Sequence, residues 1–189
     1  KPRAEVVAEG FYPLRGRRGV QIPLQEFRRN RQAIDFVDNR LNQVLPGLAE
    51  TTKTRLNRDL RRSLTEGTNL GLRGKDLEDY IANGISDSLG KKRLGRASTI
   101  ARTEGLALSQ FGQDLAVSQT GLTLEKEWVA QRDGVVRDSH RLADGQRVQK
   151  NGFFNVGGYN MKYPADSSGG APGKEIINCR CSLIYHEVL

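Results

Sequence analysis

The sequence has few of the residues that build a cross-linked protein. Among its 189 residues are two cysteines, two histidines and one tryptophan. The cysteines, Cys179 and Cys181, are two positions apart, so a bridge between them would be strained and no disulfide framework is expected. No apolar run approaches the roughly 18 to 20 residues that span a bilayer, and no basic-then-apolar signal segment opens the chain. We therefore expect assembly in a reducing compartment, without a membrane.

The basic residues are concentrated in the first part of the chain. The formal net charge is +8; residues 1–120 contain 21 Lys and Arg against 14 Asp and Glu, and the later residues contain 9 against 8. Residues 1–23 are rich in proline and glycine, show no helical period and carry Arg15, Arg17 and Arg18. We predict an extended basic arm that contacts a protein partner or, non-specifically, DNA. A merely solubilising surface is the alternative.

Residues 24–121 show the apolar periodicity of an amphipathic helical region. The predicted helices cover about 24–44, 48–67 and 75–89, and a fourth begins near Lys91 or Ser98 and ends at Gly121. Glu104 interrupts the apolar stripe of the last helix, and a buried carboxylate needs a partner. We expect an ion pair with a C-terminal arginine (Arg132, Arg137 or Arg180); a catalytic carboxylate is the alternative.

After Gly121 the helical period disappears. Residues 124–129 alternate as a strand around Trp128, and the glycine-rich residues 151–173 predict long loops. Residues 175–185 are predicted to form a strand with both cysteines on its apolar face and with Asn178 and Arg180 on the other face. The predicted fold class is therefore α+β, with a helical region at 24–121 and a small β-rich domain at 122–189.

Two thiolates on one strand face can bind a soft cation, and zinc takes four ligands from Cys, His and carboxylates. The candidate ligands are Cys179, Cys181, His140 and Asp144, and the candidate cofactor is a structural zinc ion. The alternatives are that both cysteines are small core residues or that they form the strained disulfide. His186 has the wrong strand parity to join them unless the strand ends or bends before it.

Residues 132–145 are dense in charged side chains and turn signals. Arg137, His140 and Arg180 could form an RNase-like centre, with the histidine as base and the arginines on phosphate. The alternative, which the scarcity of histidine favours, is a network of salt bridges that holds irregular loops.

Four motifs in this order resemble the phage Mu F-like minor head, or head morphogenesis, proteins over about residues 97–185. These motifs are Ala101-Arg102-Thr103-Glu104, Trp128 to Asp133 with the following Val136-Arg137, His140 and Asp144-Gly145, then Pro164 to Asp166, and Asn178-Cys179-Arg180-Cys181.

The resemblance implies a structural protein of low copy number in a tailed-phage head and no enzyme. It implies the portal or major capsid protein as partner, assembly in the host cytoplasm, a place in the virion near the portal, and help with head assembly, DNA packaging or genome delivery. It also implies that a set of motif residues forms the scaffold of the C-terminal domain. That set is Arg102, Glu104, Arg132, Asp133, Arg137, Asn178 and Arg180. Some longer members of the family append toxin or enzyme domains.

Overall fold

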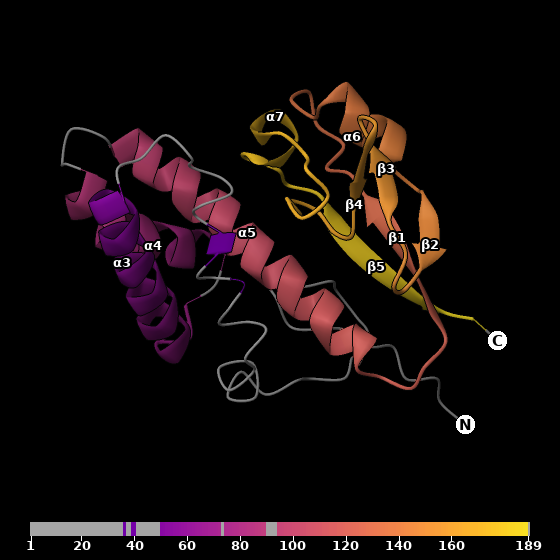
Figure 1. The fold of residues 1–189 in the computed structure, drawn as a ribbon, viewed down its shortest axis with the longest axis horizontal. Coiled ribbons are helices and arrows are strands. Elements are labelled where there is room, and N and C mark those ends of the chain that lie inside the picture. Colours follow the sequence, from indigo (N-terminus) through magenta and orange to yellow (C-terminus); the bar gives the residue numbers. More distant parts are fainter. Residues whose placement is uncertain (1–35, 37–38, 41–49, 73, 90–93, 189) are drawn as a thin grey trace. The chain divides into compact units, whose positions relative to one another are not determined.

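The computed structural model describes residues 36, 39–40, 50–72, 74–89 and 94–188 (Figure 1). The predicted arm and nearly all of the first predicted helix therefore lie outside the described residues. The described part divides into two compact units. The first, here called the helical unit, comprises the described residues of 28–105, and the second, the β-rich unit, comprises 106–188. Mixed helices and strands, with the strands all in the C-terminal part, confirm the α+β prediction.

The helical unit is built on two packed helices, α3 (Glu50–Asn69) and α4 (Gly74–Leu89). The predicted apolar stripes form its core, and five aliphatic side chains are at most 1% exposed. These are Leu56, Leu60, Leu77, Ile81 and Ile85. The two helices approach closely at Gly84, where an added Cβ would lie 1.9 Å from the Ser63 hydroxyl oxygen. The small residues Gly84 and Ser63 therefore allow the close approach of α3 and α4.

The longest helix, α5 (Leu94–Ser118), begins in the helical unit and ends in the β-rich unit. The division between the units falls after Gly105, within this helix, whereas the sequence placed the boundary of the β-rich domain after residue 121. Helix α5 buries Ile100, Glu104 and Ala107, which belong to the apolar stripe predicted to face inward. No helix among the described residues combines the length and the apolar character needed to cross a membrane.

A three-stranded antiparallel sheet organises the β-rich unit, with strand order β2-β1-β5. Strand β1 (Leu124–Val129) lies between β2 (Arg147–Gln149) and β5 (Ser182–Glu187), with Trp128 opposite Leu183. Burial alternates along β1, so Leu124, Lys126 and Trp128 point inward. The predicted strand at 124–129 is confirmed, and its inward face holds a lysine.

The glycine-rich stretch after residue 150 forms a hairpin as well as loops. Strands β3 (Phe154–Val156) and β4 (Tyr159–Met161) pair across Gly157-Gly158. Both glycines have positive φ (60° and 86°), which a two-residue turn of this kind requires. The prediction of loops alone over 151–173 was therefore wrong, because a tight Gly-Gly turn permits pairing of very short strands.

The predicted strand at 175–185 is correct only in its second half. A single helical turn, α7 (Gly173–Ile176), comes first, and Asn178 then takes a positive φ of 56°. Strand β5 begins at Ser182. Burial nevertheless alternates from Cys179 to Tyr185, so the inward positions of both cysteines agree with the predicted parity.

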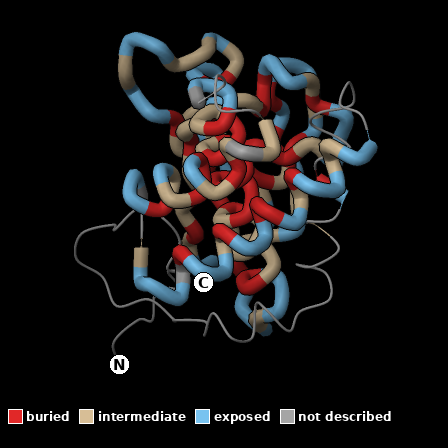
Figure 2. The backbone as a smooth tube through the Cα atoms, turned by 90° about the vertical axis from the view of Figure 1, so that its left-hand side faces the viewer, coloured by how far each residue is buried: buried red, intermediate tan, exposed pale blue. Residues whose placement is uncertain are grey.

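Trp128 is the centre of the β-rich core. It is 0% exposed, and its ring makes edge contacts with the rings of His140 (centroids 5.7 Å apart) and Phe154 (5.4 Å). His140 comes from α6 (Asp138–Ala143), a short helix within the stretch where turn signals predict irregular loops. Figure 2 shows how buried residues gather inside the fold while exposed residues follow its outer turns.

Candidate metal centre

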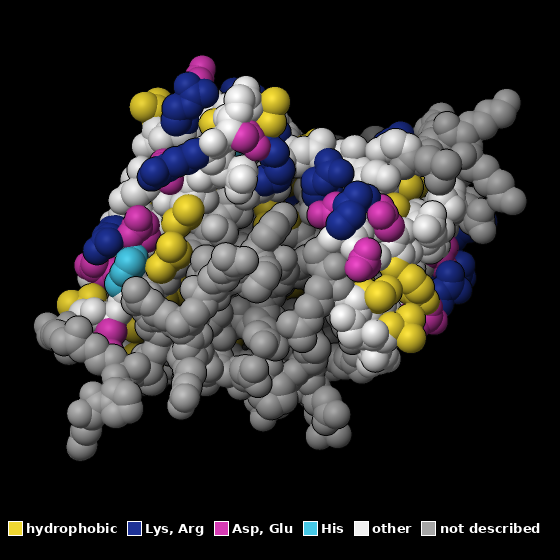
Figure 3. Space-filling model, turned by 180° about the vertical axis from the view of Figure 1, so that it is seen from behind, with side chains coloured by type: hydrophobic (Ala, Val, Ile, Leu, Met, Phe, Trp, Pro, Cys, Tyr) yellow, Lys and Arg dark blue, Asp and Glu magenta, His cyan; other side chains and the backbone are white. Residues whose placement is uncertain are grey.

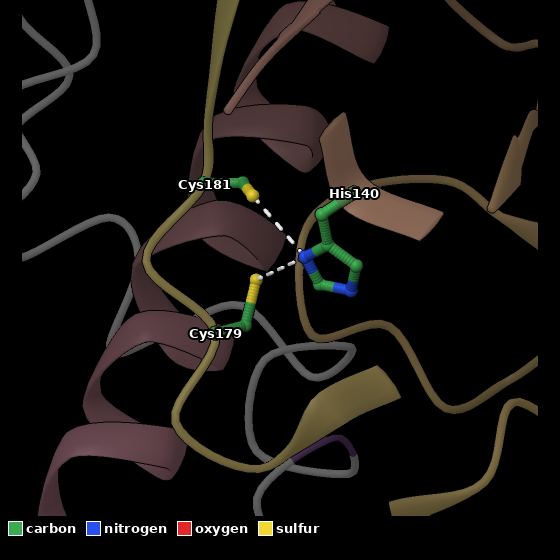
Figure 4. A group of neighbouring side chains, drawn as sticks. All are labelled: His140, Cys179 and Cys181. Carbon is green, nitrogen blue, oxygen red and sulfur yellow. Dashed lines mark hydrogen bonds between the residues drawn. The ribbon is translucent and has the colours of Figure 1, made fainter. Parts of the chain in front are cut away.

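Three of the four predicted ligands lie together in the interior of the β-rich unit (Figure 4). His140 Nδ1 lies 3.3 Å from the Cys181 sulfur and 3.7 Å from the Cys179 sulfur. The three donor atoms are within 4.8 Å of one another, and the residues are 1–2% exposed. Helix α6 supplies the histidine, and the segment between α7 and β5 supplies the cysteines.

The backbone explains why the two sulfurs meet the ring. After α7 the chain turns at Asn178, and the Cys179 amide donates to the Ile176 carbonyl. The extended segment that follows puts Cys179 and Cys181 on one side. Arg137, immediately before α6, donates a hydrogen bond to the Ile177 carbonyl and so joins the two segments. Arg137 and Asn178, two of the motif residues, therefore shape the place where the ligands meet.

The two thiols differ in acidity because of their surroundings. A hydrogen bond between the thiols raises the pKa of Cys179 well above its ordinary value, and burial raises it further. The same hydrogen bond lowers the pKa of Cys181 to about 5 against the opposing effect of burial, and the nearby His140 contributes to the lowering. Cys181 is therefore the thiol that ionises first.

The far side of the imidazole faces a carboxylate that the sequence reading missed. His140 Nε2 lies 3.3 Å from Glu175 Oε2, and Glu175 is 5% exposed. The Ser139 hydroxyl donates to the same oxygen over 2.7 Å. The contact between Nε2 and Glu175 does not have the geometry of a hydrogen bond, so Nε2 is a buried ring nitrogen beside a carboxylate. Nothing in the sequence spacing pointed to Glu175, because it lies on a helical turn where a strand was predicted.

Asp144, the fourth predicted ligand, lies outside this cluster. One of its oxygens accepts the Ala130 backbone amide and the other accepts Arg132, each over 2.9 Å. Asp144 follows directly after α6, so its side chain holds the end of β1 and the loop after it rather than the buried sulfurs. The described residues that can hold one metal ion here are His140, Cys179 and Cys181.

The other motif residues make contacts within their own units. Arg180 pairs with Asp133 at 2.6 Å. Arg102 lies 3.4 Å from Glu78. The predicted pair of Glu104 with a C-terminal arginine was wrong: its partner is Arg40, at 2.9 Å, and the two side chains are 2% exposed. Arg132, Arg137 and Arg180 are engaged elsewhere, and the periodicity of residues 24–44 gave no sign that Arg40 faces inward.

A second buried ion pair was also missed. Lys126 on β1 is 0% exposed, and its ammonium donates to Asp114 of α5 over 2.8 Å. Burial lowers the pKa of Lys126 and raises that of Asp114, and the pair partly offsets each shift. Strand parity carried the signal, since Lys126 shares the inward face with Leu124 and Trp128.

The nuclease-like alternative does not match these surroundings. The His140 ring is enclosed by two thiols, a carboxylate and Trp128, and a polymer cannot reach a side chain that is 1% exposed. Arg137 and Arg180 are committed to Ile177 and Asp133. Arg15, Arg17 and Arg18, the predicted arm contacts, lie outside the described residues.

Comparison with known proteins gives the context of this domain. The family model described as "Phage Mu protein F like protein" matches residues 54–184. The chain belongs to the phage Mu F-like family. The match covers most of the described residues of both units and includes the buried histidine and cysteines. The family is one of phage head proteins, which confirms the resemblance found in the sequence motifs.

One relative carries an enzyme name. The chain is 28% identical over 156 residues to the NAD(+)–arginine ADP-ribosyltransferase EFV of Enterococcus faecalis (strain ATCC 700802 / V583). The match covers 79% of this chain and 31% of that protein, so the chain spans less than a third of the relative's length. No solved structure matches the chain.

Proposed function

We propose that this protein is a minor structural component of a tailed-phage head that binds the portal or the capsid interior and aids head assembly, DNA packaging or genome delivery. The observation that carries this proposal is the family match over residues 54–184, which spans the helical unit and the β-rich unit together. The protein acts by binding rather than by catalysis, and its place is the virion, near the portal.

The use of the motif residues supports a binding function. The charged members of the motifs are paired inside their own units, in the contacts Arg102–Glu78, Glu104–Arg40, Arg132–Asp144 and Arg180–Asp133. Side chains that pair in this way stabilise a framework, although Arg132 stays exposed at the surface. The family signature is therefore best explained as the scaffold of a docking domain.

The face of the described residues that Figure 3 draws favours protein partners over dedicated nucleic-acid binding. On the face drawn in Figure 3, Lys and Arg side chains lie beside Asp and Glu side chains over both units. A nucleic-acid surface instead collects one sign of charge. Helix α3 does present Arg55, Arg58, Arg61 and Arg62 at exposed positions, and these give the genome a non-specific contact.

The enzymatic name of the relative is not carried over to this chain, because the chain spans 31% of that protein. The nuclease alternative has no support from the buried His140.

Co-expression with the portal protein of the same phage tests the proposal. The tagged full chain should retain the portal through affinity and size-exclusion steps. The portal of an unrelated phage is the control and should be lost. Retention of neither portal, with the major capsid protein also absent, would overturn the proposed association.

A further inference from the structure

The distances around His140 fit one shared ion. Zinc bonds of about 2.3 Å to sulfur and 2.0–2.1 Å to nitrogen, at tetrahedral angles, separate the nitrogen from each sulfur by about 3.5 Å. Here Nδ1 lies 3.3 Å from one sulfur and 3.7 Å from the other. Both nitrogen–sulfur distances are therefore within a few tenths of an ångström of those that one shared zinc ion would set, and all three donor atoms lie within 4.8 Å of one another.

Hydrogen bonds also connect these three groups, since the two thiols bond to each other and His140 bonds to Cys181. A neutral imidazole nitrogen has either one proton or one lone pair, and it directs either of them at a single partner. His140 Nδ1 instead faces two sulfurs at comparable distances. A cation between the three atoms satisfies the nitrogen lone pair and both thiolates at once.

The surroundings of the ring supply an independent observation. Histidines that bind metals usually place the second ring nitrogen against a carboxylate, which fixes the tautomer and raises the basicity of the ligand. His140 Nε2 lies 3.3 Å from Glu175, and Glu175 is itself held by the Ser139 hydroxyl.

We propose that His140 Nδ1, Cys179 Sγ and Cys181 Sγ supply three of the four ligands of one structural Zn²⁺ ion, with Glu175 positioning the histidine and a water molecule taking the fourth position. Two thiolates neutralise the charge of the ion, so the site suits the buried interior. The ligands are at most 2% exposed, and substrate cannot reach an ion among them. The ion would tie α6 to the segment before β5, which are about 40 residues apart in the chain.

Metal analysis of the full chain, purified without chelator, tests the site. The expected result is about one zinc per chain in the wild type and in His186→Gln. That control changes the other histidine, which pairs with Glu127 on the opposite side of β5. Cys179→Ser, Cys181→Ser and His140→Gln should each lose the zinc. Glu175→Gln should keep the ligands but weaken zinc affinity by about 10- to 100-fold.

A second measurement covers ligand variants that fail to fold. Wild-type chain stripped with a chelator is titrated with Zn²⁺ alone while the fluorescence of Trp128, the sole tryptophan, follows thermal unfolding. A rise of at least about 5 °C at saturating zinc supports the proposal. Purified wild type without zinc, together with no shift on titration, overturns it. Zinc that remains bound in the cysteine variants overturns the ligand assignment.

Discussion

The two units of this protein keep their cores by different means. In the helical unit, α3 and α4 meet through aliphatic side chains at regular spacing, with the Arg40–Glu104 pair as the buried charged contact that the structure describes. The β-rich unit has short strands and builds its interior from Trp128, the Lys126–Asp114 pair and the His140 cluster. Periodic apolar packing defines the first unit, and specific polar contacts define the second. Three of the four family motifs lie in the β-rich unit, which depends on polar contacts.

The largest effect is expected from breaking the buried pair of the β-rich unit. Asp114→Ala removes the carboxylate from an ammonium that is 0% exposed. Stranding a buried charge costs about 3–5 kcal/mol of unfolding free energy. Denaturant unfolding, followed by Trp128 fluorescence, measures the loss.

The matched control replaces both partners, as Lys126→Met with Asp114→Leu. Burial lowers the pKa of Lys126 and raises that of Asp114, so the ionised pair carries a desolvation cost at pH 7. The free energy of unfolding of the double variant should therefore be within about 1 kcal/mol of the wild-type value, or higher. An equal loss of unfolding free energy in the single and double variants would show that the stranded charge is not the cause of the loss.

A smaller loss is expected at the helix crossing of the helical unit. Gly84→Ala would ordinarily stabilise a helix by up to about 1 kcal/mol. Here the new Cβ would lie 1.9 Å from the Ser63 oxygen, and the clash should cost about 1–3 kcal/mol instead. Urea unfolding followed by circular dichroism measures whether the substitution lowers or raises the free energy of unfolding. Gly95→Ala, on α5 with no atom within 4 Å of the added Cβ, is the control and should be neutral or stabilising.

The buried pair of the helical unit gives a pH-dependent difference. Burial raises the pKa of Glu104 despite the neighbouring Arg40, so the folded state holds a proton that the unfolded state has already released. The stability from this group is present below its ordinary pKa and is lost as pH rises through the raised pKa. Glu104→Gln has no such dependence, because it keeps a hydrogen-bond acceptor for Arg40 but cannot titrate. As pH is lowered, the free energy of unfolding of the wild type should rise relative to that of the variant. A difference between the two that does not change with pH contradicts this account.

The smallest effect is expected at an exposed motif residue. Arg132 is 84% exposed at its side chain while it pairs with Asp144, and exposed pairs contribute below about 1 kcal/mol. Arg132→Ala should therefore shift thermal unfolding only slightly. Asp144→Ala also frees the Ala130 amide and should cost more, by about 1 kcal/mol. Equal shifts would mean that the backbone contact of Asp144 adds nothing.

The sequence predicted those elements whose apolar residues recur at regular spacing. The helices at 48–67 and 75–89, the strand at 124–129 and the inward parity of Cys179 and Cys181 all follow from spacing, and the structure has them. Spacing failed where a single residue redirects the chain. The turn at Asn178 and the Gly157-Gly158 hairpin depend on positive φ, which a periodic pattern does not report.

The candidate site was predictable only in part for the same reason. Residue chemistry selected His140 and the two cysteines, because few other residues of the chain bind soft metals. That Asp144 lies outside the cluster and Glu175 beside it depends on the positions of α6 and α7, which are too short to show a period. Partners such as Arg40 for Glu104 depend on packing between segments 64 residues apart. Such contacts are set by the folded core and leave no local signal.

The central claim is that this chain is a structural component of the phage head. Quantitative mass spectrometry of purified, nuclease-treated virions of the phage that encodes it tests that claim most directly. The account predicts the chain in intact heads at a few copies for each portal, far below the major capsid protein. A chain that is absent from virions and found only free in the lysate would contradict it.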